Sequence, residues 1–502
     1  MADKADEKRE IERKYESDDS GLPDLTGVAG VAAVLDKGLV ELDATYYDTS
    51  DQRLTSAALT LRRRTGGTDA GWHLKVPVEP GVRDEIRAPL SDTVPEEIAA
   101  LVRSRVRDAE LVPLVRLRSA RDVRHLVDAE GTLLAEASVD TVTAERLDGR
   151  GGAAQWTEIE VELADDGDPA FLDQVEKRLR RAGVRPSASP SKLARALEQT
   201  GGHRRGNDAP APPVTTGDHV LAYLRAQRDA LVELDPAVRR DVPDSVHRMR
   251  VATRRARSTL RTFRSLLDRT VTDPVAAELK WLAAELGVDR DHEVQAERLT
   301  AAVDSFPPEL VAGPVRERLA AWAEARHGGA HAHLTGVLDS RRYLTLLDTL
   351  DALLAAPPLR KAAGKRPEKA LAKAVHKDLA TLSALVERAL AAPPGQERDV
   401  AVHEARKKAK RTRYAAEAAT PALGKPARSL ARSMKSLTTL LGDHQDSVMT
   451  RLTLRELSAV AHAAGESTFT YGLLYGREEA RAAQAEADLP AVWKEAGSGT
   501  GL

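Results

Sequence analysis

Apolar and polar residues alternate with a period of two through much of residues 8–164, which is the pattern of β-strands with two different faces. Turn-forming glycine pairs, such as Gly66-Gly67 and Gly151-Gly152, separate the alternating segments. A run of about eight such strands predicts an antiparallel sheet closed into a barrel. We predict the strands at 8–16, 40–48, 57–65, 71–78, 82–88, 112–127, 132–145 and 155–164.

The pattern changes after a Gly/Pro-rich segment at 201–217, which we interpret as a linker. Apolar residues then recur with the helical period. The expected helices are 218–234, 245–268, 273–287, 315–326, 340–355, 367–391, 400–419 and 427–441. The predicted fold is therefore α+β in two domains, with an eight-stranded antiparallel barrel at 6–200 and an all-α bundle at 218–485. We expect a flexible tail at 486–502.

One expected helix carries a continuous basic stripe. Residues 246–264 contain seven arginines, one histidine and no acidic residue. Six basic residues fall within one arc of about 100° on an ideal helix: His247, Arg250, Arg254, Arg257, Arg261 and Arg264. The opposite side is apolar, so the helix is amphipathic. Because like charges along one ridge repel each other, the stripe indicates a bound polyanion.

The same basic spacing returns later in the chain. His403, Arg406, Lys410 and Arg413 repeat the order of His247, Arg250, Arg254 and Arg257. A second set follows each copy at nearly the same offset: Lys280, Leu282, Leu286, Gly287 and Asp291 match Lys435, Leu437, Leu441, Gly442 and Asp446. Two patterns at almost one offset predict an internal two-fold repeat of helices. The second copy has Glu417 where the first has Arg261, so we expect the first half to bind more tightly.

Composition limits the chemistry. The chain has 502 residues and no cysteine, which excludes disulfides, thiolate catalysis and cysteine metal ligands. Aromatic residues make up only 3%, so the cores must consist of aliphatic side chains. The net charge of −2 averages locally acidic and basic segments and says little about partners. With no apolar run near 18 residues and a charged start, we expect a cytoplasmic protein without a membrane partner.

The strands of the first domain place charge on one face. Glu10, Glu12 and Lys14 alternate, and Arg62 with Arg64 repeats the pattern. Such a face cannot form a dry core, because unpaired buried charges cost several kcal/mol each. We therefore expect a wet cavity inside the barrel. Carboxylates without cysteine select Mg²⁺ or Mn²⁺, and arginine with lysine selects phosphate oxygens. Together they predict hydrolysis at a terminal phosphate.

The first 200 residues resemble the CYTH family, the triphosphate tunnel metalloenzymes. The family's ExExK motif corresponds to Glu10-Ile11-Glu12-Arg13-Lys14. Further matching positions follow in order: YYDT at 46–49, LRRR at 61–64, HLK ending at Lys75, Arg83 and Glu85, Arg121, Asp140, EIEVE at 158–162 and Ser191-Lys192. The resemblance implies an eight-stranded tunnel, dependence on a divalent metal and a triphosphate-bearing substrate.

The resemblance also implies roles for individual residues. Glu10, Glu12 and Lys14 would be catalytic. The metal ligands would come from Glu10, Glu12, Glu85, Asp140, Glu158, Glu160 and Glu162, and the phosphate ligands from Lys14, Arg62, Arg64, Lys75, Arg83, Arg121 and Lys192. Strand parity cannot choose among the three acids at 158–162, since they share one face. Arg121 is out of phase with Arg116 and Arg118. We favour Arg121 as the inward residue, and we expect the other two to be exposed.

Residues 218–485 resemble the CHAD family of histidine-bearing helical domains, through HRMRVATRRAR at 247–257 and LGVDRD at 286–291. This resemblance implies two related halves around a basic groove that binds inorganic polyphosphate. The polyphosphate ligands would be His247, Arg250, Arg254, Arg257, Arg261, Arg264, Lys280, His403, Arg406, Lys407, Lys410, Arg413 and Lys435. We expect the two histidines to hydrogen-bond phosphate or to cap the local packing, rather than to act in catalysis.

The combined prediction is a polyphosphate-binding protein with a metal-dependent triphosphatase barrel, associated with polyphosphate granules through its helical half. Three alternatives remain open from the sequence. The barrel could be inactive, leaving a binding protein alone. It could act on an organic triphosphate, as an adenylate cyclase or a thiamine triphosphatase does. Nucleic acid could occupy the basic helices, although few aromatic residues are present for base stacking.

Overall fold

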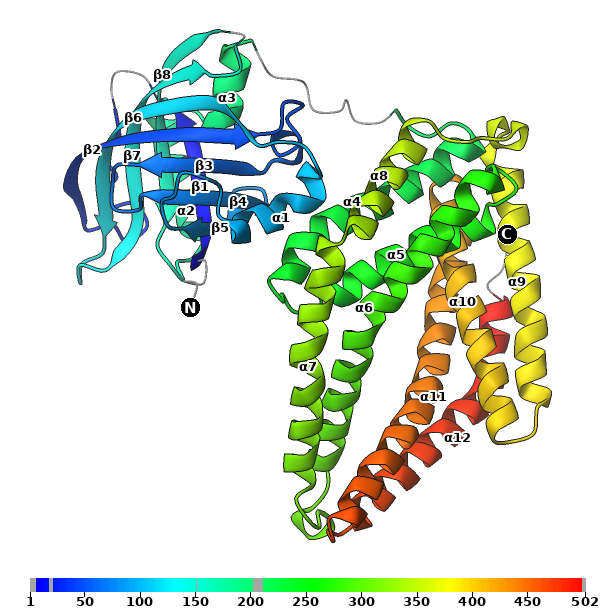
Figure 1. The fold of residues 1–502 in the computed structure, drawn as a ribbon. Coiled ribbons are helices and arrows are strands. Elements are labelled where there is room, and N and C mark those ends of the chain that lie inside the picture. Colours follow the sequence, from blue (N-terminus) through cyan, green and yellow to red (C-terminus); the bar gives the residue numbers. More distant parts are fainter. Residues whose placement is uncertain (1–5, 18–20, 150, 202–210, 499–502) are drawn as a thin grey trace. The chain divides into compact units, whose positions relative to one another are not determined.

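The computed structural model describes residues 6–17, 21–149, 151–201 and 211–498 (Figure 1). The chain divides into two compact units, Met1–Ala211 and Pro212–Leu502. Most of the expected linker lies outside the described residues. Its last two residues begin helix α4 (Thr216–Arg239), where Thr215 and Asp218 cap each other's backbone amides.

The first unit is a closed barrel of eight antiparallel strands, as the alternating pattern predicted. The order around the barrel is β1-β5-β4-β3-β2-β6-β7-β8. The strands are β1 (Asp6–Glu16), β2 (Ala33–Asp48), β3 (Thr60–Thr65), β4 (Gly71–Glu79), β5 (Val82–Ala88), β6 (Val112–Val127), β7 (Leu133–Arg146) and β8 (Ala153–Leu163). Strand β2 starts seven residues before its predicted start at 40, because a bulge between Asp36 and Gly38 breaks the alternation there.

The barrel reverses the usual placement of polar and apolar faces. Many of its charged side chains point inward, and large apolar side chains such as Trp72 and Tyr15 point outward against helices that the sequence did not reveal. Helix α1 (Glu96–Val106) covers one apolar patch around Trp72, and α2 (Ala170–Arg181) covers another around Tyr15. A short 3₁₀ turn, η1 (Thr55–Ala57), precedes β3. The helices supply the dry core that the charged interior cannot supply.

A third helix closes one end of the barrel. Helix α3 (Lys192–Gln199) begins at Ser191, whose hydroxyl accepts a hydrogen bond from the amide of Ala194 at 3.1 Å. Its apolar residues Leu193 and Leu197 pack into a cluster with Trp156 and the inward-facing apolar residues at this end of the strands. The interior is therefore a cavity with a floor, and Lys192 projects into it from the start of α3.

The second unit consists of helices, apart from an isolated antiparallel bridge between Leu267 and Leu359 in the part of the chain described. Its α-helices are α4, α5 (Ser245–Thr262), α6 (Arg269–Asp304), α7 (Val315–Asp339), α8 (Arg341–Ala355), α9 (Pro367–Ala391), α10 (Gln396–Leu423), α11 (Lys425–Ala463) and α12 (Phe469–Ser498), with 3₁₀ turns η2 (Pro308–Leu310) and η3 (Lys361–Gly364). Every predicted helix is present, but α6, α7 and α11 are much longer than predicted. None of the helices described is long and apolar enough to cross a membrane.

Two predictions about this unit need correction. The expected tail at 486–502 is helical as far as Ser498, because Leu489 and Trp493 of α12 pack into the core formed with α9, α10 and α11. Helix α5 ends at Thr262, two residues before the end of the predicted basic stripe. Phe263 is buried just beyond that end, and Arg264 lies in the following turn.

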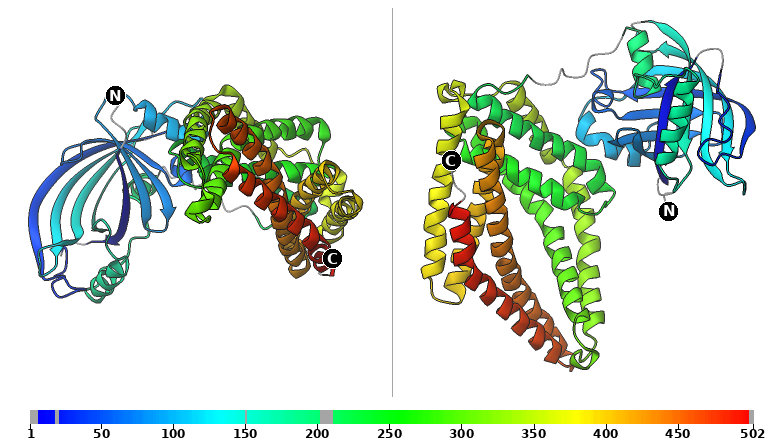
Figure 2. Two further views of the ribbon diagram at one scale, coloured as in Figure 1. Left: turned by 90° about the horizontal axis from the view of Figure 1, so that it is seen from below. Right: turned by 180° about the vertical axis from the view of Figure 1, so that it is seen from behind.

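The helical unit has two main apolar cores. One involves α4, α5, α6 and α8, and the other involves chiefly α9, α10, α11 and α12. The hairpins α6–α7 and α11–α12 extend away from α5 and α10 and meet at their tips (Figures 1 and 2). There Leu299 and Val303 pack with Leu454 and Tyr471. This arrangement frames a space between the two hairpins, and α5 and α10 border it with their basic faces.

Candidate functional site

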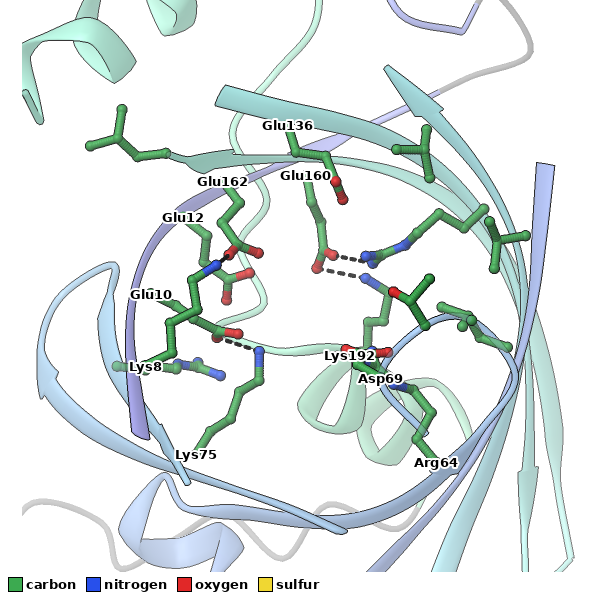
Figure 3. Close-up of a pocket in the computed structure, with 18 of the residues that line it drawn as sticks. Lys8, Glu10, Glu12, Arg64, Asp69, Lys75, Glu136, Glu160, Glu162 and Lys192 are labelled. Atoms are coloured by element: carbon green, nitrogen blue, oxygen red, sulfur yellow. Dashed lines mark hydrogen bonds and ion pairs between the residues drawn. The ribbon is translucent and has the colours of Figure 1, made fainter. Parts of the chain in front are cut away.

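The barrel encloses a cavity of about 600 Å³ whose wall is mostly charged (Figure 3). Glu10 and Glu12 enter it from β1, Lys75 from β4, Glu160 from β8 and Lys192 from α3. They converge because alternate residues of every strand point to the same face. The parity argument from the sequence thus predicted the content of the cavity correctly.

The floor of the cavity holds three carboxylates around one ammonium group. Lys192 Nζ lies 2.8 Å from Asp140, 2.7 Å from Glu158 and 2.5 Å from Glu160. Carboxylate oxygens of these acids lie within 4.8 Å of one another. Burial disfavours the charged ammonium, but the carboxylates outweigh this effect and raise the pKa of Lys192. Arg121 completes the cluster, with 2.7 Å to Asp140 and 2.6 Å to Glu160.

A second acidic group lies on β1. Burial raises the pKa of Glu10 to about 7, although Lys75 contacts this carboxylate and opposes the rise. Burial acts in the same direction on Glu12, but Lys14 at 3.1 Å and Lys75 reverse the effect and lower the pKa of Glu12 to about 2. Neighbouring carboxylates on one strand therefore have very different proton affinities.

Cations line the remaining wall. Arg62 lies 3.4 Å from Glu85 and 3.4 Å from the hydroxyl of Tyr46. Arg64 contacts Asp69, and burial together with Arg62 lowers the pKa of Arg64 to about 9. A lowered pKa means that the guanidinium charge is under-compensated, so an incoming anion would be stabilised there.

The wall contains the donor set that a hard divalent cation requires. Its candidate ligands are carboxylate oxygens from β1, β5, β7 and β8, which suits Mg²⁺ or Mn²⁺ better than Zn²⁺. The lysines and arginines that now neutralise these acids can turn to phosphate oxygens when a metal replaces them. The residues present therefore fit both a metal and a polyphosphate.

The structure brings the predicted barrel residues together. Those that line the cavity are Glu10, Glu12, Lys14, Arg62, Arg64, Lys75, Arg83, Arg121, Glu160, Glu162 and Lys192. Glu85, Asp140 and Glu158 lie just behind this wall, where each contacts a cation that lines it. Glu158 pairs with Lys192 at the floor of the cavity, whereas Glu162 pairs at 2.8 Å with Lys8. The acids of β8 therefore lie at successive depths along the barrel.

The structure places Arg121 and its neighbours on opposite faces of β6. Arg121 faces the cavity, whereas Arg116 and Arg118 contact Asp43 on the outer face. The register between β6 and β7 is unbroken from Arg116 to Arg121, so simple alternation places them on opposite faces without a bulge.

The sequence analysis assigned no role to several polar residues of the wall, among them Lys8, Tyr46, Asp69 and Arg87. Lys8 and Arg87 share parity with Glu10 and Glu85, so the same alternation could have identified them. Tyr46 is buried, and Arg62 with Lys192 outweighs the effect of burial and lowers its pKa. Asp69 belongs to a loop, for which no periodic signal exists.

The helical unit contains a second charged cavity, of about 830 Å³. The predicted residues that line it are His247, Arg250, Arg254, His403, Arg406, Lys407 and Lys410. A Cβ built on Gly287 would lie 3.3 Å from the guanidinium of Arg250, and one on Gly442 would lie 3.7 Å from that of Arg406. The glycines of α6 and α11 therefore leave room for the guanidinium groups of Arg250 and Arg406.

Six of the predicted polyphosphate ligands do not line this cavity: Arg257, Arg261, Arg264, Lys280, Arg413 and Lys435. Arg264 lies beyond the end of α5, and Lys280 and Lys435 are exposed. Arg413 is held by Glu417 at 2.8 Å, and the same acid binds Arg255 at 3.0 Å. Glu417 thus neutralises neighbouring arginines, which the sequence comparison of the two halves did not anticipate.

Residues that the sequence analysis did not select complete the cavity wall. Arg298 and Gln295 come from α6, and Gln445 and Asp446 come from α11. The Gln445 side chain lies 2.6 Å from the ring nitrogen Nδ1 of His403. Burial raises the pKa of Asp446, although Arg406 and Arg298 oppose the rise. No periodic pattern marks Gln295, Arg298 or Gln445, and Asp446 appeared in the sequence only as the match of Asp291 in the repeat.

Comparisons with known proteins agree with the two-unit architecture. The family model of the CYTH domain matches residues 8–197, and that of the CHAD domain matches residues 222–455. The uncharacterized protein Rv2226 of Mycobacterium tuberculosis is 39% identical, over 97% of this chain and 96% of its own length.

Solved structures show similarity to parts of the chain. PptA from Streptomyces chartreusis is 22% identical with a TM-score of 0.47, covering 56% of this chain and 99% of its own. The crystal structure of the CHAD domain from the plant Ricinus communis is 24% identical with a TM-score of 0.44, covering 57% and 92%. Because both domain models match and a relative aligns over nearly the whole chain, the protein belongs to the family in which a CYTH domain precedes a CHAD domain.

Proposed function

We propose that the barrel hydrolyses the terminal phosphate of tripolyphosphate or of a polyphosphate chain, and that the helical unit holds inorganic polyphosphate in its basic cavity. The observation that carries the proposal is the interleaving of carboxylates and cations in a barrel cavity with one closed end. Neither group alone would select a metal-bound polyphosphate, whereas both together do.

The proposed chemistry assigns a task to each group of residues. Glu10, Glu12 and the floor acids Asp140, Glu158 and Glu160 would hold Mg²⁺ or Mn²⁺, which supplies charge stabilisation at the transferred phosphoryl group. Lys75 and Arg62 would bind the phosphate oxygens and orient the chain. Electrostatic stabilisation of this kind, preorganised in a closed site, is commonly the largest contribution to catalysis.

The closed end sets a direction for the substrate. Because α3 and Trp156 fill one end of the barrel, a phosphate chain can enter only with a terminus. Cyclic trimetaphosphate has no terminus, so we expect it to release no phosphate under conditions in which linear tripolyphosphate is consumed. Phosphate release is measured by colorimetry, with linear chains as the positive control. Hydrolysis of the ring at a rate comparable with the linear chain would contradict a one-ended site.

Two features favour polyphosphate over nucleic acid in the helical cavity. Apart from the histidines, Tyr414 is the aromatic residue among the described lining residues. Its ring already has the guanidinium groups of Arg255 and Arg413 at 5.7 and 6.0 Å, which limits its availability for base stacking. Competition of RNA and DNA against labelled polyphosphate at one salt concentration tests the assignment, and a preference for nucleic acid would overturn it.

Binding in the helical cavity should depend on pH through Lys410. Burial, followed by Arg406, Arg254 and Arg250, lowers the pKa of this lysine to about 7. A bound polyanion favours the charged amine and raises that pKa, so binding takes up protons when the pH exceeds 7. We expect polyphosphate affinity to fall between pH 7 and 8.5, with an uptake of about one proton per site near pH 8.

Calorimetry in buffers of different ionisation enthalpy measures that uptake. Lys410→Arg keeps the charge throughout this range, so it should retain affinity and abolish the proton uptake assigned to Lys410. His247 and His403 line the same cavity, and any uptake that persists in the variant belongs to other groups. An unchanged pH profile in Lys410→Arg would remove Lys410 from the proposed role.

A second candidate function rests on the apolar part of the barrel wall. Val40, Leu42 and Val123 line the cavity beside the charged residues, and inorganic phosphate offers nothing for them to contact. An organic triphosphate could place its organic group there. A panel of tripolyphosphate, long-chain polyphosphate, ATP and thiamine triphosphate separates the candidates, since each predicts a different preferred substrate.

A further inference from the structure

One lysine of the helical cavity differs from its neighbours in its surroundings. Lys410 lines the cavity together with Arg250, Arg254 and Arg406. Asp446 is the one acid among the lining residues described, and its charge acts to raise the pKa of Lys410, but within the described part of the chain no ion pair joins the two residues. The amine thus faces an open, anion-attracting space without a carboxylate to hold it. Its pKa is lowered to about 7 by burial and by the three arginines, so much of it is uncharged at neutral pH.

Two lysines on the same turns of α10 provide a comparison. Lys407 also lines the cavity, but it contacts Glu404 and is half exposed. Lys408 is buried outside the lining, where its amine donates a hydrogen bond of 2.5 Å to Asp378. Burial lowers the pKa of Lys408 too, yet Asp378 occupies its nitrogen. Only Lys410 among these three combines access from the cavity with a nitrogen that no described carboxylate holds.

We propose that Lys410 is a site of covalent acylation by small acyl phosphates, which the cavity concentrates through its arginines. The phosphate group of such a molecule would bind Arg250, Arg254 or Arg406, which brings its carbonyl carbon near the amine. The nitrogen lone pair attacks that carbon, and a carbon–nitrogen bond forms. The carbon–oxygen bond to phosphate breaks, orthophosphate leaves, and the proton of the amine passes to solvent. No oxidant or further reactant is needed.

The modification would change the proposed function of the cavity. Acylation removes the positive charge that Lys410 acquires when polyphosphate binds, and it fills space beside the three arginines. Polyphosphate affinity should therefore fall, and bound polyphosphate should in turn protect the amine. This consequence rests on the proposed polyphosphate binding, whereas the acylation itself does not.

The chain offers an internal control for the experiment. Cleavage after Glu404 and Glu417 yields the peptide 405–417, which contains Lys407, Lys408 and Lys410 and no other acidic cleavage site. The intact protein is treated with acetyl phosphate at pH 7.5, and fragment ions of this peptide locate the acetyl group at successive times. We expect Lys410 to react at least about tenfold faster than either neighbour, as expected for an amine activated by its surroundings. Equal rates at the three lysines, or a slower rate at Lys410, would overturn the proposal.

Two further experiments separate the effect of the arginines from the effect of bound polyphosphate. Arg254→Gln removes a phosphate-binding arginine that also lowers the pKa of Lys410, so acetylation of Lys410 should slow while that of Lys408 stays unchanged. Long-chain polyphosphate added before the reagent should protect Lys410. If Lys410 reacts fastest but polyphosphate does not slow its acetylation, the proposed acylation site is supported and polyphosphate does not occupy this cavity. If polyphosphate binds the unmodified protein but Lys410 shows no preference, the binding function stands and the acylation site is refuted.

Discussion

Replacing both Glu10 and Glu12 by glutamine is expected to lower phosphate release from tripolyphosphate by at least about a hundredfold with Mg²⁺ or Mn²⁺ present. Glutamine keeps the shape of each side chain but removes the charge that would bind the metal. Both acids line the cavity, and they are 3% and 8% exposed. The measurement is the steady-state rate at saturating substrate across a range of metal concentrations.

The control is a pair of glutamine substitutions at acids far from the cavity. Glu110 and Glu130 are both exposed and belong to loops of the barrel unit, so their replacement should leave the rate unchanged. Polyphosphate binding by the helical unit should survive in the Glu10→Gln, Glu12→Gln protein, because the substitutions lie in the other unit. A rate within about threefold of the wild-type protein would exclude the proposed metal site.

Reversing the charge of Arg254 and Arg406 together is expected to weaken the binding of long-chain polyphosphate by at least about a hundredfold at 0.15 M salt. Each arginine lines the cavity from a different half of the helical unit. Glutamate at both positions removes two favourable contacts and adds two repulsive ones within the same space. Direct titration of labelled polyphosphate into the full chain measures the loss.

Arg341 and Arg388 supply the matched control. Both are exposed arginines of the helical unit that do not line the cavity, so Arg341→Glu with Arg388→Glu gives the same change in net charge. This control should lose only a few-fold in affinity. If the two double variants lose affinity equally, binding is a general charge effect and does not depend on the cavity.

The same pair of variants tests whether the units cooperate. If the helical unit presents polyphosphate to the barrel, Arg254→Glu with Arg406→Glu should raise the KM for long chains and leave turnover of tripolyphosphate unchanged. Tethering a binding module to an enzyme raises the local concentration of a shared substrate. An unchanged KM for long chains would show that the two units act independently.

Strand parity explains why so much of the barrel site was predictable. An inward-facing position on a strand recurs at every second residue, so Glu10, Glu12 and Lys14 had to share a face once β1 formed. The same rule separated Arg121 from Arg116 on the long strand β6. Residues outside the alternation were not predictable: Asp69 lies in a loop, and α1 and α2 were hidden because strongly charged residues dilute their short apolar faces.

The helical unit shows where the one-dimensional pattern fails. A single arc of basic residues on the predicted helix suggested one long ligand-binding surface. In the structure, α5 ends before Arg264. On α10, Arg413 forms an ion pair with Glu417. Helical periodicity reports which residues share a face, but it does not report what lies opposite that face. Arg298 was missed for the same reason, and Asp446 was noted only as part of the repeat, since only the packing of α6 and α11 brings these two residues to the cavity.

The sequence by itself determined the number of barrel strands and their approximate positions along the chain, the charged character of their inner face, and the two basic helices. These properties follow from local periodicity, which depends only on residues that are close together in the sequence. The tertiary structure alone decided that α3 closes the barrel, so that Lys192 meets three carboxylates at its floor. It also decided which basic residues of α5 and α10 face a common cavity. Those outcomes depend on contacts between residues far apart in the chain, and no local pattern encodes them.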